Sequence, residues 1–98
     1  MKIGYVRVST EEQNTARQEI MLRELGVDEL FVDRASGKNA DRPELNRMMN
    51  FVRRGDTVIV ESISRFARNT RDLLDLVERL TEKQVEFVLS LIHHLRVL

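Results

Sequence analysis

The sequence predicts a three-layer α/β fold in which a mainly parallel, four-stranded sheet is flanked by helices. One observation and one general rule predict it. Short strand-like segments alternate with longer segments of helical periodicity along the chain. Strands separated by helical crossovers pair in parallel, with the helices packed on the sheet. The chain has 98 residues, which suits one domain, so we expect residues 1–98 to form a single domain.

The chain opens with a predicted strand followed by a helix. Alternating side chains over residues 2–8 are typical of a strand. Residues 9–13 contain two overlapping capping-box patterns, which predict that a helix begins there. We expect that helix to run to Leu25 and to bury the leucines of its last turn, with Met21. Gly26 is placed to end it.

The second strand is predicted at residues 29–33. Residues 34–41 hold no apolar side chain larger than alanine, so they predict a loop. Asp41 is expected to cap the next helix, and Pro43 fits its first turn. The helix itself is predicted from apolar side chains that recur at positions i, i+3, i+4 and i+7, which are Leu45, Met48, Met49 and Val52.

The second half of the chain repeats this pattern. Residues 57–60 are apolar and β-branched, as in a strand that is covered on both faces. Residues 62–70 predict a polar connection, and residues 85–88 predict the fourth strand. The third helix is predicted from the same helical spacing of apolar side chains, which here are Leu73, Leu76, Val77 and Leu80.

Composition excludes several classes of protein. No apolar run approaches about 20 residues, which excludes a membrane span. The first residues do not resemble a secretory signal, so we expect a cytoplasmic protein. The absence of cysteine excludes disulfides, thiolate catalysis and cysteine-based zinc sites. Sixteen basic and sixteen acidic residues give a net charge of zero, so an argument for nucleic-acid binding must depend on local clusters.

Such clusters occur where ligand sites of parallel sheets lie, beyond the carboxyl ends of the strands. The segment at residues 62–71 holds three arginines and no acidic residue. Arg65 and Arg68 are three positions apart, so on a helical turn they would face the same way. The hydroxyl and cationic side chains expected near these strand ends are Arg7, Ser9, Ser36, Lys38, Arg42, Arg65, Arg68 and Arg71.

This combination of side chains suits a phosphate group. The planar fork of arginine matches two phosphate oxygens, and a helix N-terminus adds N–H donors. A serine such as Ser9 that attacks a phosphodiester would form a covalent phosphoserine, with fixed cations stabilising the charge of the transition state. No group of carboxylates or histidines suggests a metal site, so arginines could take the place of a metal ion.

Each of these residues also has an ordinary structural explanation. Ser9 could be only a helix cap, and arginines in a polar loop commonly form a solvated surface. Tyr5 could be a core aromatic, while Asp33 and Asp41 could serve turns and caps. The convergence of these residues on the ends of three strands is what favours a site.

Three segments resemble motifs of the serine recombinases, the resolvase and invertase family. The resemblance covers roughly residues 1–88, with the motifs in the family's order and spacing, which is a far more specific signal than one short motif. The matching segments are YVRVST (residues 5–10) with Gln13, DRASG (33–37) with DRPEL (41–45), and GD (55–56) with SRFARNT (64–70).

The resemblance implies a role for each matching residue. Ser9 would be the nucleophile that attacks a DNA phosphate and stays joined to the 5′ end. The scissile phosphate would be surrounded by the arginines of the motifs, namely Arg7, Arg42, Arg65 and Arg68. The residues that would shape and orient the site are Tyr5, Gln13, Asp33 and Ser36.

The family also implies partners. These would be double-stranded DNA and further copies of the recombinase, as dimers that pair into a tetramer, without a membrane, a metal or a small-molecule cofactor. The chain departs from the family pattern at Gln84, where a glycine is usual, and at Ser64, where many members carry aspartate. Residues 89–98 are apolar and differ from the polar loop of the family. We therefore expect the long dimerisation helix and the DNA-binding domain to be missing, as a frameshift or premature stop near residue 89 would explain.

Two other interpretations stay open from the sequence. The chain could be a non-catalytic interaction module that keeps the fold and pairs with related recombinases. It could also be a small phosphate-binding α/β domain, although it has no glycine-rich phosphate loop. The motifs do not identify a target DNA site, and they do not distinguish resolution from inversion or integration.

Overall fold

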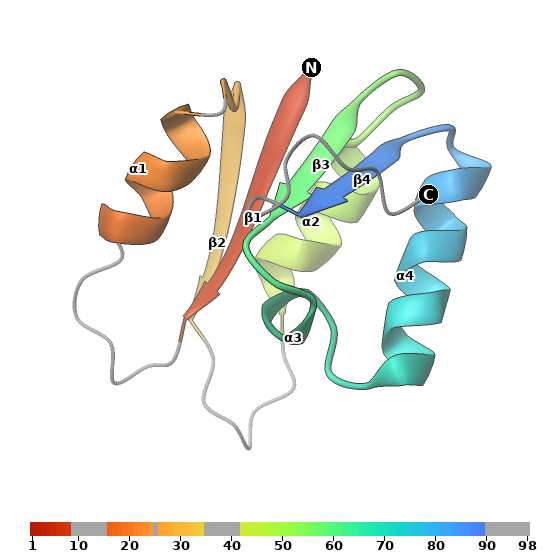
Figure 1. Cartoon of the computed structure of the whole chain (residues 1–98). Helices are drawn as coiled ribbons and strands as arrows, with labels where there is room; N and C mark the ends of the chain where they lie inside the picture. The colour runs from red at the N-terminus through yellow and green to blue at the C-terminus, as the bar shows by residue number, and fades with distance from the viewer. Residues whose placement is uncertain (9–15, 25, 35–41, 90–98) are drawn as a thin grey trace.

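Four strands form one parallel sheet in the order β2–β1–β3–β4 (Figure 1). The computed structural model describes residues 1–8, 16–24, 26–34 and 42–89. All three neighbouring strand pairs are parallel, which confirms the predicted sheet. The strands are β1 (Lys2–Val8), β2 (Glu29–Arg34), β3 (Thr57–Val60) and β4 (Glu86–Leu89).

The strand boundaries agree with the prediction except at three ends, one of which is the end of β4 at Leu89 rather than at Val88. β2 includes Arg34, one residue more than expected. β4 begins at Glu86 rather than at Val85, because the N–H of Val85 donates to the carbonyl of Leu80 at the end of the preceding helix. The N–H of Glu86 donates to the carbonyl of Asp56 next to β3, so β4 can join the sheet only from that residue.

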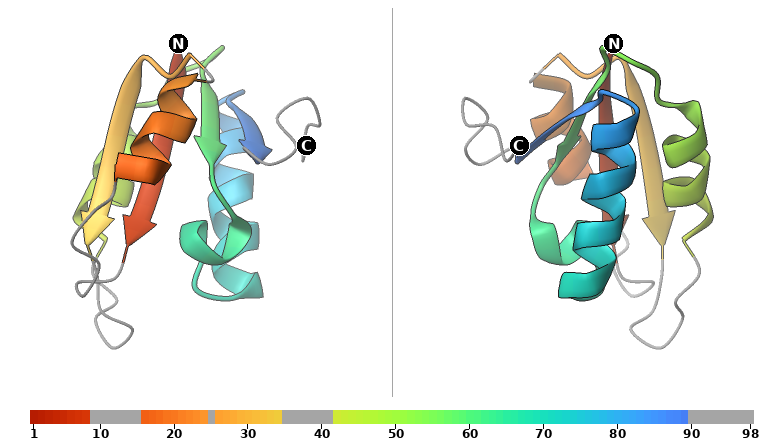
Figure 2. Two further views of the ribbon diagram at one scale, coloured as in Figure 1. Left: turned by 60° about the vertical axis from the view of Figure 1, so that its left-hand side comes forward. Right: turned by 90° about the vertical axis from the view of Figure 1, so that its right-hand side faces the viewer.

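The helices lie on both faces of the sheet (Figure 2). On one face, Leu22 of the first helix is fully buried and shares a core with Val6, Val8 and Ile59. The opposite face carries the larger core, which packs against the second and fourth helices. No helix in the described ranges is long and apolar enough to cross a membrane. The helices are α1 (Ala16–Glu24), α2 (Pro43–Phe51), α3 (Ile63–Phe66) and α4 (Thr70–Glu82).

The ends of α1 test part of the sequence prediction. Gly26 adopts a φ of 82°, and its N–H donates to the carbonyl of Arg23 at 3.0 Å, as expected of the residue that ends the helix. Of the side chains expected in its core, Leu22 is confirmed. Leu25 and the capping-box patterns at residues 9–13 lie outside the described residues, and the side chain of Met21 is not described.

The prediction of a polar connection at residues 62–70 is wrong in part. The short helix α3 lies within it, and the side chain of Phe66 is completely buried. Its ring packs against Phe87 at a centroid distance of 4.7 Å and against Tyr5 at 6.3 Å. The polar composition of the segment gave no sign that Phe66 is a core residue, because Tyr5 and Phe87 meet it only in the tertiary structure.

Gln84 occupies the turn between α4 and β4 in a conformation that glycine favours. Its φ is 61°. Its N–H donates to the carbonyl of Thr81, and the next N–H, from Val85, donates to that of Leu80. This is the Schellman pattern that ends many helices, and its left-handed position is commonly glycine because a Cβ atom is strained there.

Gln84→Gly should therefore stabilise the protein. Relief of the left-handed strain is expected to raise the free energy of unfolding by about 0.5–1 kcal/mol, measured by urea denaturation. Glu82→Gly, a similar change at an exposed helical position two residues earlier, should instead lower it by about 0.5–1 kcal/mol. Equal effects of the two substitutions would contradict this explanation of the turn.

Candidate functional site

A buried carboxylate joins three elements at the carboxyl end of the sheet. Asp33 of β2 is only 2% exposed. One of its oxygens accepts the N–H of Glu44 at 2.9 Å, and the other accepts the N–H of Leu45 at 2.9 Å and the hydroxyl of Tyr5 at 2.7 Å. Asp33 therefore supplies the oxygen acceptors that the first turn of α2 lacks, and its charge lies at the positive end of that helix.

This contact corrects the expected cap of α2. The residue at the N-cap position is Arg42, which makes no side-chain capping bond, and Pro43 occupies the first turn as predicted. Asp41 lies outside the described residues. The cap comes from β2, and thus from a residue that is distant in the sequence.

Tyr5 of β1 is the second part of this arrangement. Burial, the hydrogen bond to Asp33 and the charge of that carboxylate together raise the pKa of Tyr5 far above its usual range. The hydroxyl therefore stays protonated and donates to Asp33. The rings of Tyr5 and Phe66 meet in a T-shaped contact with an interplanar angle of 73°, so the Tyr5 side chain links β1, β2 and α3.

Two arginines join the end of β1 to α3 in a reciprocal manner. Nη2 of Arg7 donates to the backbone carbonyl of Ser64 at 2.8 Å. Nη1 of Arg65 donates in turn to the backbone carbonyl of Arg7 at 2.9 Å. Nε of Arg65 also lies 3.6 Å from a carboxylate oxygen of Glu61. Both guanidinium groups are therefore held beside the carboxyl end of β1.

Arg42 reaches α3 from the opposite side. Its Nη1 donates to the carbonyl of Phe66 at 3.0 Å, and its guanidinium forms an ion pair with Asp72 at 2.9 Å. The side chain is only 8% exposed. With the contact from Arg7, two carbonyls of the last turn of α3 are satisfied by arginines from other elements, which suits the negative end of a helix.

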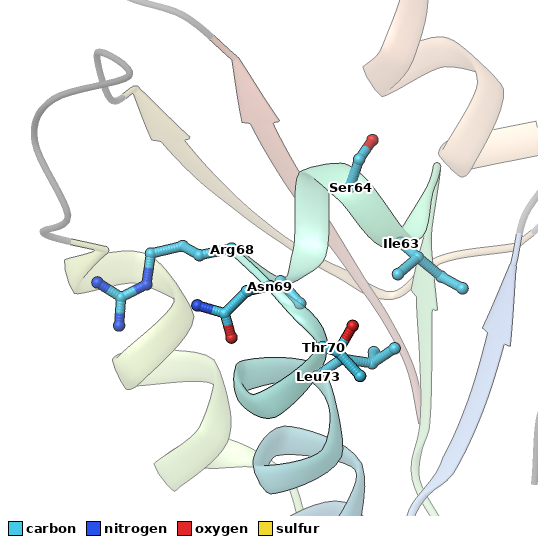
Figure 3. Close-up of a pocket in the computed structure, with 7 residues that line it drawn as sticks. Ile63, Ser64, Arg68, Asn69, Thr70 and Leu73 are labelled. Atoms are coloured by element: carbon cyan, nitrogen blue, oxygen red, sulfur yellow. The ribbon is translucent and has the colours of Figure 1, made fainter.

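Arg65 and Arg68 do not share a helical turn, which contradicts the expectation from their spacing. α3 ends at Phe66, and Ala67 has extended backbone. The side chains of Ser64 and Arg68 leave the α3–α4 segment in different directions (Figure 3). Within the described part of the chain, the exposed guanidinium of Arg68 makes no hydrogen bond, while its backbone N–H donates to Asp72 at 2.9 Å.

A shallow pocket of about 420 Å³ lies along this segment. Apolar side chains of Ile63, Ala67 and Leu73 form part of it, and Arg68 lies on its polar side with Asn69 and Thr70 (Figure 3). Arg71 lines a second hollow with Arg68 and Asp72. Arg68 thus borders both hollows.

The charges of the four motif arginines are unequally compensated. Asp72 faces Arg42, and Glu61 faces Arg65. Among the described residues, Arg7 and Arg68 have no carboxylate partner. The positive charge available to an anion is therefore concentrated on these last two arginines.

The structure brings together most of the described candidates. Contacts link Tyr5 with Asp33, Arg7 with Arg65, and Arg42 with the segment that carries Arg68, while Arg71 lies on α4 beside the second hollow. Within the described ranges, no three His, Cys, Asp or Glu side chains lie together as a metal ion would need. The candidates outside the described residues are Ser9, Gln13, Ser36 and Lys38.

Sequence reasoning missed Asp72. A signal was available, because Asn69 and Asp72 have the spacing of a helix cap and the third helical residue. The side chain of Asn69 indeed accepts the N–H of Asp72 at 2.8 Å. That pattern predicts the start of α4 but not the pairing of the Asp72 carboxylate with Arg42.

Residues 2–92 match the family described as "Resolvase, N terminal domain". The chain is 48% identical over 89 residues to the transposon Tn501 resolvase of Pseudomonas aeruginosa, and 47% identical over 87 residues to the DNA-invertase of Escherichia phage P1. These alignments cover 89% of this chain but 46% and 47% of the relatives, so the chain spans about half of their length.

Solved structures share the fold. A resolvase family site-specific recombinase from Streptococcus pneumoniae matches with a TM-score of 0.75 and 24% identity, over 99% of this chain and 76% of that one. The C-terminal catalytic domain of ISC1926 TnpA, an IS607-like serine recombinase, matches with a TM-score of 0.70 and 20% identity, over 91% of this chain and 66% of that one.

Asp33→Ala should destabilise the protein more than Tyr5→Phe. The alanine variant leaves the Tyr5 hydroxyl and two N–H groups of α2 without an acceptor, which we expect to lower the free energy of unfolding by about 2–4 kcal/mol. Tyr5→Phe removes one donor and should cost about 1 kcal/mol. Urea denaturation measures both, and equal losses would show that Asp33 does not hold α2.

The contribution of Asp72 to stability should disappear in acid. Burial alone would raise the pKa of Asp72, but hydrogen bonds from Arg42 and from the N–H of Arg68 outweigh it and hold the pKa below the ordinary 3.8. A carboxyl whose pKa is lower in the folded state stabilises that state above the unfolded pKa and loses this effect as the pH falls through the folded pKa.

Asp72→Asn is therefore expected to lower the free energy of unfolding by about 1–3 kcal/mol near neutral pH. The difference from wild type should start to narrow as the pH falls below the unfolded pKa of 3.8, and it should vanish once the pH is below the lower pKa of the folded wild type. Denaturation curves at a series of pH values measure it. A difference that stays constant down to acidic pH would contradict the ionic contacts.

Proposed function

This chain belongs to the resolvase family, and from that membership we propose that it supplies the catalytic domain of a serine recombinase that carries out site-specific DNA strand exchange. The observation that supports the proposal most directly is the arrangement of arginines at the carboxyl end of the sheet. Arg7 and Arg65 are held there by each other's backbone segments, and Arg68 extends from the same region.

In the proposed reaction, the hydroxyl oxygen of Ser9 attacks a DNA phosphorus. The bond from phosphorus to the 3′ oxygen breaks, the hydroxyl proton of Ser9 passes to solvent, and the leaving 3′ oxygen takes up a proton from solvent to become a hydroxyl. The phosphate then links Ser9 to the 5′ end. Attack by the 3′ hydroxyl of another strand reverses these steps and releases Ser9, so that each phosphodiester is exchanged for another bond of the same class.

The arginines would stabilise the charge that develops on the phosphoryl oxygens. Fixed donors are effective because they do not reorganise during the reaction. Here Arg7 and Arg65 are bonded to backbone carbonyls, which restrains their orientation. Arg68 brings a charge that no described carboxylate neutralises.

The remaining candidates have supporting roles in this proposal. Tyr5 and Asp33 would act by holding the start of α2, and with it Arg42, beside α3. Arg71 would contact the DNA backbone next to Arg68. Three residues that lie outside the described ranges would complete the site. Gln13 and Ser36, which belong to the family motifs, would help to orient Ser9, and Lys38 would contact a DNA phosphate.

The proposed partners are double-stranded DNA and further copies of a recombinase. Its relatives include a transposon resolvase and a phage DNA-invertase, and the name of the second states that it acts on DNA. Because the chain is electrically neutral overall, its affinity for DNA would depend on the local arginines. That affinity should fall steeply with salt.

The decisive experiment is to trap the protein–DNA intermediate. The chain is incubated with supercoiled DNA, denatured with detergent, digested with nuclease and protease, and analysed by mass spectrometry. We expect a nucleotide remnant on the peptide that contains Ser9. Ser9→Ala should abolish it, whereas Thr81→Ala, which removes a hydroxyl that bonds within α4, should keep it. A folded wild-type protein without this adduct would overturn the proposal for this chain.

A further inference from the structure

The carboxylate of Asp72 contacts two segments that precede it in the chain. One oxygen accepts Nη2 of Arg42 at 3.1 Å, and the other lies 2.9 Å from Nη1 of Arg42. The second oxygen also accepts the backbone N–H of Arg68 at 2.9 Å. Asp72 thereby connects the start of α2 with the connection between α3 and α4.

This arrangement differs from that of an ordinary acidic residue in a first helical turn. Such residues interact with the dipole of their own helix and usually remain solvated. The cap of α4 is supplied by Asn69 instead, which accepts the N–H of Asp72. The carboxylate of Asp72 is only 14% exposed, and it faces an arginine that is 8% exposed. The position of the Asp72 carboxylate is thus explained by its contacts with Arg42 and with the backbone of Arg68 more than by capping of α4.

The side chain of Arg42 connects the start of α2 with the end of α3 and the first turn of α4. A guanidinium has five N–H groups. Both Nη atoms of Arg42 face Asp72, and Nη1 also donates to the carbonyl of Phe66. The pair of nitrogens that would form a bidentate contact with a phosphate therefore holds Asp72 and the end of α3.

Asp72 contacts the backbone of Arg68 and leaves its side chain free of that contact, unlike the side chain of Arg42. Asp72 fixes the backbone of Arg68 through the N–H but makes no contact with its guanidinium, which is exposed and unbonded among the described residues. The negative charge of Asp72 is already matched by Arg42. Asp72 can therefore set where the Arg68 side chain starts without neutralising its charge.

We infer that Asp72 is a positioning residue of the phosphate site, which acts through Arg42 and the backbone of Arg68 to direct the Arg68 guanidinium toward the reacting phosphate. The inference rests on the proposed function for its reaction but not for its anion contact. An oriented group loses much of its effect when it is displaced by about 1 Å. Loss of Asp72 should therefore reduce phosphate binding by Arg68 even if the fold is kept.

Three variants isolate this role. Asp72→Asn removes the charge with little change of shape. Glu78→Gln removes a carboxylate charge six residues later, from an exposed side chain of α4 that does not line either hollow beside Arg68. Val77→Ala removes a half-buried methyl pair of α4 that packs against the larger core, so it lowers stability without touching Arg42 or Arg68. Circular dichroism and thermal unfolding show which variants remain folded at the assay temperature.

The first measurement does not require strand exchange. Inorganic phosphate is titrated while the Nε–Hε resonances of the arginines are followed by NMR. Wild type, Glu78→Gln and Val77→Ala should show a saturable shift of the Arg68 resonance. Asp72→Asn should need at least about threefold more phosphate, because a free anion has few other contacts to hold it, whereas duplex DNA has many. An unchanged phosphate affinity in folded Asp72→Asn would overturn the inference.

The second measurement follows formation of the Ser9 adduct. At saturating DNA, Asp72→Asn should be slowed by about 10- to 100-fold, with little change in the DNA concentration that gives half the maximal rate. An equal slowing in Val77→Ala would overturn the positioning role, because stability loss alone would then explain it. If wild type forms no adduct, the proposed function fails for this chain, and the phosphate titration alone decides about Asp72.

Discussion

The buried carboxylate of Asp33 is the contact on which the carboxyl end of the sheet depends. A charge in a protein interior is costly unless hydrogen bonds replace its lost water, and Asp33 receives donors from Tyr5, Glu44 and Leu45. Because these donors come from β1 and α2, the carboxylate can be satisfied only when both elements meet β2. The same contact determines where α2 begins, and so where Arg42 starts.

α3 shows how the arginines serve the fold as well as the proposed chemistry. A helix of four residues is far below the length at which an isolated helix forms in water. Its stability comes from the burial of Phe66 in the main core and from its carbonyls, which accept donors from Arg7 and Arg42. Arg7 and Arg42 are therefore in place because they also hold the backbone that carries Arg65.

The charge distribution follows from the same contacts. The protein as a whole is neutral, yet cations are gathered at one end of the sheet. Glu61 and Asp72 partly compensate two of these arginines, while Arg7 and Arg68 keep their charge available. A fixed set of partly compensated cations creates a local field without the self-repulsion that four uncompensated arginines would cause.

The sequence by itself determined the four strands, the three longer helices, their order and the residues of the motifs. Apolar spacing such as that of α4 reflects contacts within a few residues, and crossovers by helices permit only a small number of sheet topologies. Family motifs likewise identify Arg7, Arg42, Arg65 and Arg68 by position alone.

Only the tertiary structure decided how those residues are used. The helical turn expected for Arg65 and Arg68 is interrupted at Ala67. The cap of α2 comes from Asp33, eleven residues before Glu44, and Asp72 pairs with Arg42 across thirty residues. Such contacts leave no periodic trace in the sequence, because the partner of a buried charge is set by which strands and helices meet in space.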